Sequence, residues 1–139
     1  MDQTTIQRIH DSFAAQSMMQ TLGAELSDVS AGLVRITAPI LAGARQQQGH
    51  GHAGLTFSIG DSAAGYAALT TLPLDMEVVT AEIKINLVAP ARGDHLVAAG
   101  RVIKTGKRLC VVTSEVHAVE NGKETLIAIL QGTMVPVPR

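Results

Sequence analysis

The stretch AGLTFSIGDSAAGYAALTT, residues 53–71, decides how this chain folds. Small and apolar side chains fill nearly every position, and the stretch is long enough for about five helical turns. A helix that is apolar nearly all round is buried, because none of its faces suits water. Leu72-Pro73-Leu74 ends it, since proline cannot continue a helix. The stretch therefore predicts one long central helix with the rest of the chain packed around it.

The segments on either side supply a second helix and a sheet. Residues 4–22 carry apolar side chains at helical spacing before Gly23, so residues 1–22 form an N-terminal helix. Residues 24–40 predict two short strands with a break at 28–32, and the second half predicts four strands at 80–87, 96–104, 108–119 and 125–135. Pro136 and Pro138 end the last strand. The chain is expected to be a single domain, residues 1–139, of the α+β class: a meandering antiparallel sheet wrapped around one long central helix.

Within the first of these four strands, polar and apolar residues alternate cleanly. The two expected faces are Thr80, Glu82, Lys84 and Asn86 on one side, and Ala81, Ile83, Ile85 and Leu87 on the other.

Composition excludes several functions. The net charge is −1 and aromatic residues make up 2% of the chain, so nucleic acid is not an expected partner. No apolar run is long enough to span a membrane, and the first residues do not resemble a signal peptide. The single cysteine, Cys110, cannot form an internal disulfide and is interpreted as a core residue, which favours a cytoplasmic location.

Asp61 is the only formally charged residue between Arg45 and Asp75. Burying an unpaired carboxylate costs several kcal/mol, so its place inside an apolar helix requires an explanation. Two structural explanations are a solvent-facing position and an ion pair with a distant lysine or arginine. The functional explanation is that Asp61 acts as a base or nucleophile.

The loop before the long helix, residues 42–52, favours the functional explanation. Its sequence AGARQQQGHGH is polar and rich in glycine, and it leads into a helix start with unpaired N–H groups. Such a helix start can hold a developing oxyanion, which together with a carboxylate is the minimum set for acyl transfer. Ala53 and Asp61 lie about 12 Å apart along the helix, so if both act on one carbonyl they come from different subunits across a two-fold interface.

Other candidate sites are weaker. His50, His52 and Asp61 do not match metal-ligand spacings, so neither a metal nor another cofactor is expected.

The order of motifs from Gly49 onward resembles that of hotdog-fold acyl-CoA thioesterases, in particular the phenylacetate-pathway (PaaI-type) branch. Residues 49–54, GHGHAG, followed by Asp61, are similar to the family signature G-x-x-H-G-G-x(6)-D. Residues 79–94 and 102–107 resemble the next strands and turns of that branch, and the resemblance spans roughly residues 20–135.

The resemblance implies a hotdog fold and a role for several residues. Asp61 is the catalytic carboxylate, the Ala53 amide polarises the thioester oxygen next to Gly54, and His52 supports the loop. Thr80 lies near the carboxylate and its water, and Gln46 helps to hold the nucleophile or thioester. Two positions depart from the family pattern: Ala53 stands where relatives carry glycine, and Gln46 where many carry asparagine. The backbone N–H and the side-chain amide both survive, so the departures affect acyl preference.

The expected function is hydrolysis of an acyl-CoA thioester by a homodimer with shared sites that assembles into a homotetramer. Basic residues near turns are candidates for binding the CoA phosphates: Arg92, Lys104, Lys107 and Arg108. Two alternatives remain open, a hotdog hydratase or dehydratase acting on acyl thioesters, and a non-catalytic acyl-CoA binding module.

Overall fold

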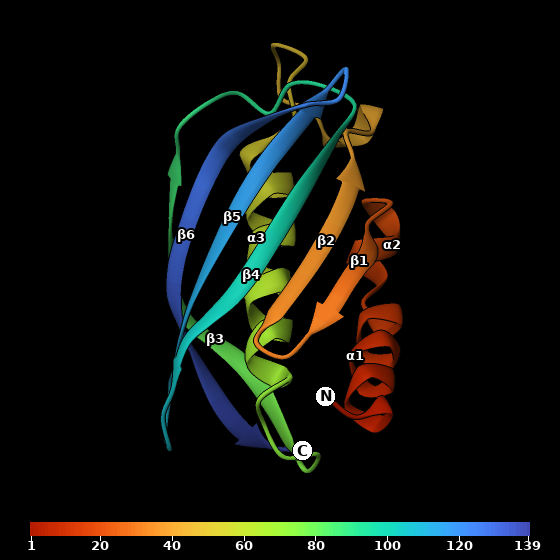
Figure 1. The fold of residues 1–139 in the computed structure, drawn as a ribbon. Helices are drawn as coiled ribbons and strands as arrows, with labels where there is room; N and C mark the ends of the chain where they lie inside the picture. Colours follow the sequence, from red (N-terminus) through yellow and green to blue (C-terminus); the bar gives the residue numbers. More distant parts are fainter.

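In the computed structural model, which describes all 139 residues, the apolar stretch forms helix α3 (Ala53–Leu69) and the sheet curves around it (Figure 1). Helix α3 is buried along most of its length, with Ile59, Ala63 and Ala67 fully inaccessible to solvent. At Gly100 the helix backbone lies so close to the sheet that an added Cβ would collide with the backbone of Ala63 and Ala64. Small residues therefore let helix and sheet approach closely.

Six antiparallel strands form the sheet, in the spatial order β1-β2-β4-β5-β6-β3. Their bounds are β1 Glu25–Ser30, β2 Leu33–Pro39, β3 Met76–Leu87, β4 His95–Thr105, β5 Cys110–Glu120 and β6 Lys123–Pro138. A short 3₁₀ turn, η1 (Ala42–Ala44), follows β2. The prediction of an α+β fold with an antiparallel sheet around one long helix is confirmed. The first hairpin turn is narrower than expected, since β1 continues to Ser30.

The predicted meander is wrong at β3, which pairs with β6 at the far edge of the sheet and not with β4. Residues 88–94 cross over the end of the sheet, as the backbone N–H of Val88 donates to the Ile127 carbonyl and that of Asp94 to Val119. Strand β4 pairs with β2, whereas a meander would place β3 beside it. This arrangement leaves one long side of β3 without a partner strand.

Strand β6 continues through Pro136 and Pro138, where the sequence predicted an end. The N–H of Arg139, just after β6, donates to the Asp75 carbonyl. Backbone N–H groups of a strand point alternately to its two sides, so the nitrogens of Pro136 and Pro138 point away from β3. Pairing with β5 has already stopped at Met134, so no hydrogen bond is lost on that side. Proline is tolerated in such an edge position.

The N-terminal helix is interrupted at Gln16, giving α1 (Gln3–Ala15) and α2 (Ser17–Thr21). Gln16 has an extended backbone, and its side chain reaches the hydroxyl of Tyr66 on α3. The single predicted helix is therefore wrong, because this tertiary hydrogen bond competes with helix continuation. No helix of the chain has the length and hydropathy needed to cross a bilayer.

Candidate active site

Asp61 lies midway along α3 and is partly buried between the helix and the start of β3. The Thr80 hydroxyl donates a 2.8 Å hydrogen bond to Asp61 Oδ1. The two ion pairs of the chain, Arg35–Asp28 and Arg139–Glu77, lie elsewhere, so no cation neutralises this carboxylate. Within one chain, therefore, Asp61 is not a structural ion-pair partner.

Burial raises the pKa of the Asp61 carboxyl above its usual value, and the hydrogen bond from Thr80 acts in the opposite direction. Desolvation disfavours the charged form, so an ionised Asp61 is a stronger base than an exposed aspartate. A carboxylate of this kind can accept a proton from water or attack a carbonyl carbon.

A β-bulge aims Thr80 at Asp61. Pairing between β3 and β6 shifts between Thr80 and Glu82, so Ala81 is an extra residue and the side-chain alternation changes phase. Thr80 consequently faces Asp61 and Met134, on the same side as Ile83, while Glu82 bonds Thr133. The sequence-based alternation, which placed Thr80 on the same face as Glu82, is wrong for this reason. Gly132 allows the close approach, because a Cβ there would collide with the Glu82 carbonyl and Ile83.

Asp61 opens into a hollow of about 260 Å³, here called the Asp61 hollow. Its walls come from α1, α3, β3 and β6, with Ser12, Gln16, Asp61, Ser62, Gly65, Tyr66, Leu69, Glu77, Val78, Thr80 and Met134.

A second hollow, of about 510 Å³, lies at the start of α3 and is here called the loop hollow. It is lined by the polar loop, the first turn of α3 and the crossover after β3, with Gln46, Gln47, Gln48, His50, Gly51, His52, Ala53, Thr56, Leu87, Val88, Ala89, Pro90 and Ala91. The two hollows have no lining residue in common.

The start of α3 leaves one amide available. His52 is the N-cap, and its Nδ1 accepts a 2.7 Å hydrogen bond from the Gly54 N–H. The Ala53 N–H makes no hydrogen bond within the chain and is exposed in the loop hollow. This donor stands at the positive end of the helix dipole, which suits a carbonyl oxygen that is becoming negative.

The Gln46 side chain binds its own loop. Its Oε1 accepts from the backbone N–H groups of Gln48 and His50, so in one chain it stabilises the loop and does not contact Asp61. Arg45 has a similar effect, donating to the carbonyls of Ile40 and Gly49. The sequence analysis did not single out Arg45 as a residue that stabilises the loop. Its only sequence signal was its position next to the run of glutamines at 46–48.

Within one chain the predicted catalytic residues fall into two groups. Gln46, His52, Ala53 and Gly54 lie at the loop hollow, while Asp61 and Thr80 lie at the other one. The eight positions between Ala53 and Asp61 on α3 correspond to about 12 Å. The structure does not bring the two groups together within a chain.

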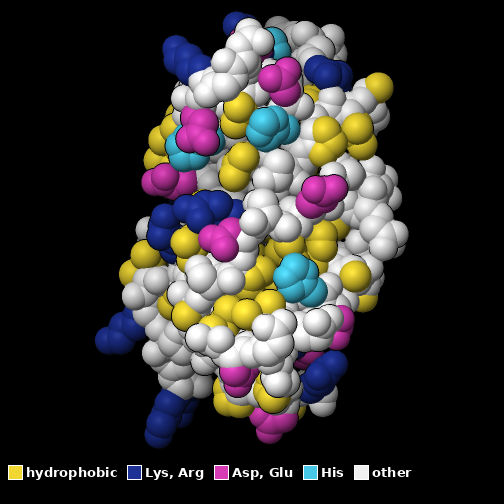
Figure 2. Space-filling view, turned by 45° about the vertical axis from the view of Figure 1, so that its right-hand side comes forward, with side chains coloured by type: hydrophobic (Ala, Val, Ile, Leu, Met, Phe, Trp, Pro, Cys, Tyr) yellow, Lys and Arg dark blue, Asp and Glu magenta, His cyan; other side chains and the backbone are white.

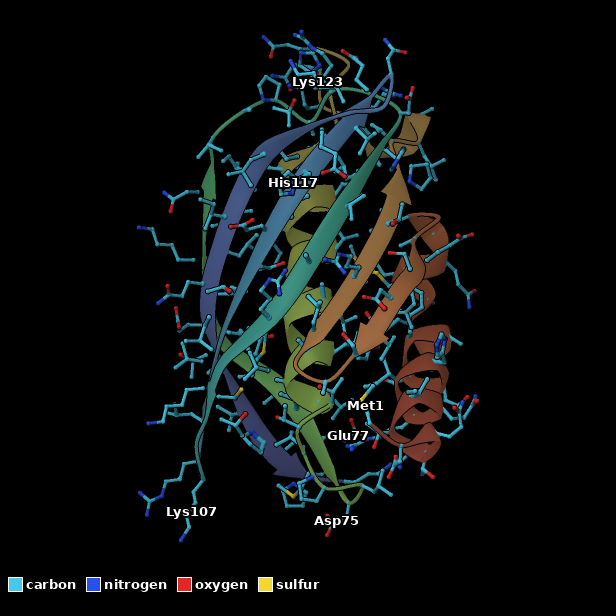
Figure 3. The ribbon with its side chains drawn as sticks, in the orientation of Figure 1. Met1, Asp75, Glu77, Lys107, His117 and Lys123 are labelled. Carbon is cyan, nitrogen blue, oxygen red and sulfur yellow. The ribbon has the colours of Figure 1, made fainter.

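The predicted phosphate-binding cations are also separated. Lys104 and the hairpin residues Lys107 and Arg108 lie at one end of β4, and Arg92 lies beyond its other end. Strand β4 has 11 residues, about 36 Å at roughly 3.3 Å per residue. Lys123 lines the same hollow as Arg92. Figure 3 shows Lys123 at one end of the molecule and Lys107 at the other. Basic side chains likewise stand at both ends in the space-filling view (Figure 2).

Sequence reasoning also missed the α1 wall of the Asp61 hollow. Ser12 and Gln16 are polar residues of a segment that the sequence predicts as one amphipathic helix, a pattern that a solvated face also produces. Only the hydrogen bonds of both side chains to Tyr66 reveal their position. No three His, Cys, Asp or Glu side chains are grouped closely enough to hold a metal ion.

Comparison with known proteins identifies the family of this chain. A family model described as the thioesterase superfamily matches residues 48–125, a segment that includes Ala53, Asp61 and Thr80. The chain belongs to the thioesterase superfamily. Superfamily membership makes it a hydrolase of the thioester-cleaving class, and the architecture described above is the hotdog fold.

Individual relatives agree with this assignment. A thioesterase family protein from Silicibacter pomeroyi is 35% identical, with a TM-score of 0.95 over 97% of this chain and 99% of that one. A provisionally named esterase from Saccharolobus solfataricus is 29% identical over 94% of this chain and 85% of its own length. The Escherichia coli PaaI protein from the phenylacetic acid degradation operon has a TM-score of 0.84 at 22% identity, over 96% of this chain and 93% of that one. The last similarity shows a common fold.

Proposed function

We propose that the protein hydrolyses acyl-CoA thioesters to a free carboxylic acid and CoA, with Asp61 as the catalytic carboxylate. The observation that carries the proposal is the environment of Asp61, which is partly buried, has a raised pKa and lacks a cationic partner. A binding module has no use for such a costly charge. A hydratase or dehydratase needs a histidine free to act on the substrate together with the carboxylate, whereas the Nδ1 of His52 is engaged as the N-cap of α3 and accepts from the Gly54 N–H.

In the proposed reaction the Ala53 N–H binds the thioester oxygen and stabilises the negative charge that develops on it. Asp61 then acts in one of two ways. It takes a proton from water, which attacks the carbonyl carbon, or it attacks that carbon itself and the resulting anhydride is hydrolysed. In both cases the C–S bond breaks, the acyl group leaves as the acid and the CoA sulfur takes up a proton. The Thr80 hydroxyl holds the carboxylate in position.

We propose that each active site is shared between two chains of a homodimer. The separation between Ala53 and Asp61 supports this arrangement, since one carbonyl reaches both only if they belong to different subunits. The free edge of β3 offers a surface for a second chain. Val79 on β3 and Phe57 on α3 are apolar side chains with exposed fractions of 50% and 37%. The exposed Ile129, on the outer face of the sheet, supports further assembly into a homotetramer.

We further propose that Arg92 contributes to binding the CoA phosphates, because its hollow and the loop hollow have Ala89 and Pro90 in common. Lys104, Lys107 and Arg108 lie at the opposite end of the chain and reach a site only from another subunit. The buried free thiol of Cys110 supports a reducing, cytoplasmic location.

The test is release of free thiol from a panel of acyl-CoAs by the wild type and by Asp61→Asn. We expect the variant to lose at least about 10²-fold in kcat, because a carboxylate acting as general base contributes about that much or more. Asp75→Asn, an exposed position after α3, serves as the matched control and should retain full activity. Near-wild-type thiol release by folded Asp61→Asn would end the proposal.

A further inference from the structure

The Asp61 hollow extends away from the carboxylate toward the N-terminal helix. Ser12 and Gln16 form its wall on the α1 side, and Tyr66 and Leu69 belong to the later turns of α3. From Asp61 to Tyr66 the helix rises about 7.5 Å. A group attached to a carbonyl at Asp61 therefore has room to extend toward α1.

Three polar groups meet at this end. The amide of Gln16 donates a 2.6 Å hydrogen bond to the Tyr66 hydroxyl, and Ser12 Oγ lies 3.1 Å from the same hydroxyl. The Tyr66 ring itself is buried and packs against Phe13, with centroids 6.1 Å apart. Gln16 Oε1 has no hydrogen-bond partner in the chain, so one acceptor remains available beside the hollow.

Helix α1 is held firmly enough to act as a wall. Arg8 is buried, and its Nη1 donates to the carbonyls of Leu72 and Pro73, just after α3. Together with the contacts of Ser12 and Gln16 to Tyr66, this fixes α1 to α3 and to the residues just after it at two points.

The charges of the hollow are negative. Asp61 and Glu77 both line it, and no lysine or arginine does. A terminal carboxylate on the acyl group would meet the unpaired negative charge of Asp61 in a partly desolvated space, which is unfavourable, and Glu77 is already paired with Arg139. A purely hydrocarbon end would displace water from Gln16 Oε1 without replacing that hydrogen bond, also at a cost.

We propose that Ser12, Gln16 and Tyr66 form the far end of the acyl subsite and select neutral acyl groups that carry a terminal hydroxyl. The hydroxyl donates to Gln16 Oε1 and accepts from Ser12 or Tyr66. This inference rests on the proposed thioester hydrolysis at Asp61 and adds the class of acyl group. Gln16 is a specificity-determining residue in this arrangement, and α1 belongs to the substrate site.

The test uses three acyl groups of equal carbon number: hexanoyl-CoA, ω-hydroxyhexanoyl-CoA and adipoyl-CoA. We expect kcat/KM to be highest for the hydroxyl compound, by about three- to tenfold over hexanoyl-CoA, the value of one net hydrogen bond. Adipoyl-CoA should be the poorest of the three. In Gln16→Met the hydroxyl preference should disappear, because methionine has a similar shape and no amide.

The matched control is Gln7→Met, the same substitution on an exposed part of α1, where Gln7 bonds only Asp11. It should keep the order of the three substrates. If Gln16 merely attached α1 to α3, Gln16→Met would lower all three kcat/KM values by the same factor. That result, or a wild type without a hydroxyl preference, overturns the inference.

A binding measurement separates this inference from the proposed function. Tyr66 is the only tyrosine and the chain has no tryptophan, so intrinsic fluorescence reports on this one side chain. Non-hydrolysable thioether analogues of the hexanoyl and hydroxyhexanoyl compounds should change that fluorescence, with the hydroxyl analogue binding three- to tenfold more tightly, by about one net hydrogen bond. If this preference is present but no acyl-CoA is cleaved, the proposed function fails and the acyl-group inference stands. If cleavage occurs without it, the inference alone fails.

Discussion

The two hollows along α3 are built in different ways. The loop hollow presents backbone groups, and its donor is the Ala53 N–H at the start of a helix. The Asp61 hollow presents side chains from four separate elements, and its carboxylate has a raised pKa because of burial. The first can be recognised from a short continuous motif, whereas the second depends on tertiary packing. In the proposed mechanism each holds half of the groups needed for acyl transfer, so neither would be a complete site within one chain.

Joining the halves across subunits gives the largest expected effect. Asp61→Asn and Ala53→Pro should each lose at least about 10²-fold in kcat, one through the carboxylate and the other through the N–H. Proline suits the first helical position, and His52 already has the extended backbone (φ −66, ψ 145) that a following proline requires. Ala53→Ser, which keeps the N–H, is the control and should remain active.

Co-expression of the two inactive variants then tests the sharing. Half of randomly paired dimers are mixed, and each mixed dimer has one site with both groups and one with neither. About a quarter of wild-type activity should return if each site spans a two-fold interface. Thiol release by the whole co-expressed population is the measurement, different tags show that mixed dimers form, and mixed dimers purified by both tags should reach about half of wild-type activity. Mixed dimers that stay as inactive as the parents would place both groups in one chain.

A smaller effect is expected within the Asp61 hollow from Thr80→Ala. The Thr80 hydrogen bond lowers the pKa of Asp61, so its removal should raise that pKa further. The acid limb of kcat/KM should therefore move to higher pH, with a loss of less than about tenfold at neutral pH. Thr133→Ala, on β6 and bonded to Glu82, is the control and should leave the profile in place. If the acid limb of kcat/KM in Thr80→Ala stayed at the wild-type pH, ionisation of Asp61 would not be the cause of that limb.

Cations near the loop hollow should have an effect of several-fold on KM. Reversing Arg92 and Lys123 to glutamate should raise KM for an acyl-CoA at low salt by about three- to tenfold and weaken its salt dependence, because exposed charges are screened. Reversing Lys104, Lys107 and Arg108 should have less effect. If reversing Lys104, Lys107 and Arg108 raised KM more than reversing Arg92 and Lys123, the CoA phosphates would bind at the β4–β5 hairpin instead.

The smallest effect is on stability. Because folding raises the pKa of Asp61, the folded state disfavours its ionised form, and the resulting loss of stability develops as pH rises through that raised pKa. Asp61→Asn should therefore raise Tm by about a few degrees at neutral pH, with no gain below the ordinary aspartate pKa. Thermal melts at several pH values measure this, and a destabilised Asp61→Asn at neutral pH would contradict the burial cost.

Local pattern was enough for most of the fold. The apolar run of α3 and the alternation of the strands predicted nearly every element, and the isolation of Asp61 made it the candidate catalytic residue. The errors arose where distant residues decide the local structure. Pairing of β3 with β6 carries no local signal, and the bulge at Ala81 cannot be seen in an alternating sequence. The position of Ser12 and Gln16 beside the Asp61 hollow depends on their hydrogen bonds to Tyr66, some 50 residues away in the sequence, so their local pattern could not predict it.

The attachment of α1 has a consequence for how the protein becomes active as it is made. The partners of Arg8, Ser12 and Gln16 lie 50 to 65 positions later in the chain, so helix α1 cannot form these hydrogen bonds until α3 is complete. Contacts at such long sequence separation close slowly, because the intervening loop loses entropy first. We expect the hollow beside Asp61 to be completed late in folding, when α1 docks against α3. The docking of α1 would thus set the moment at which a folded chain gains the proposed acyl subsite.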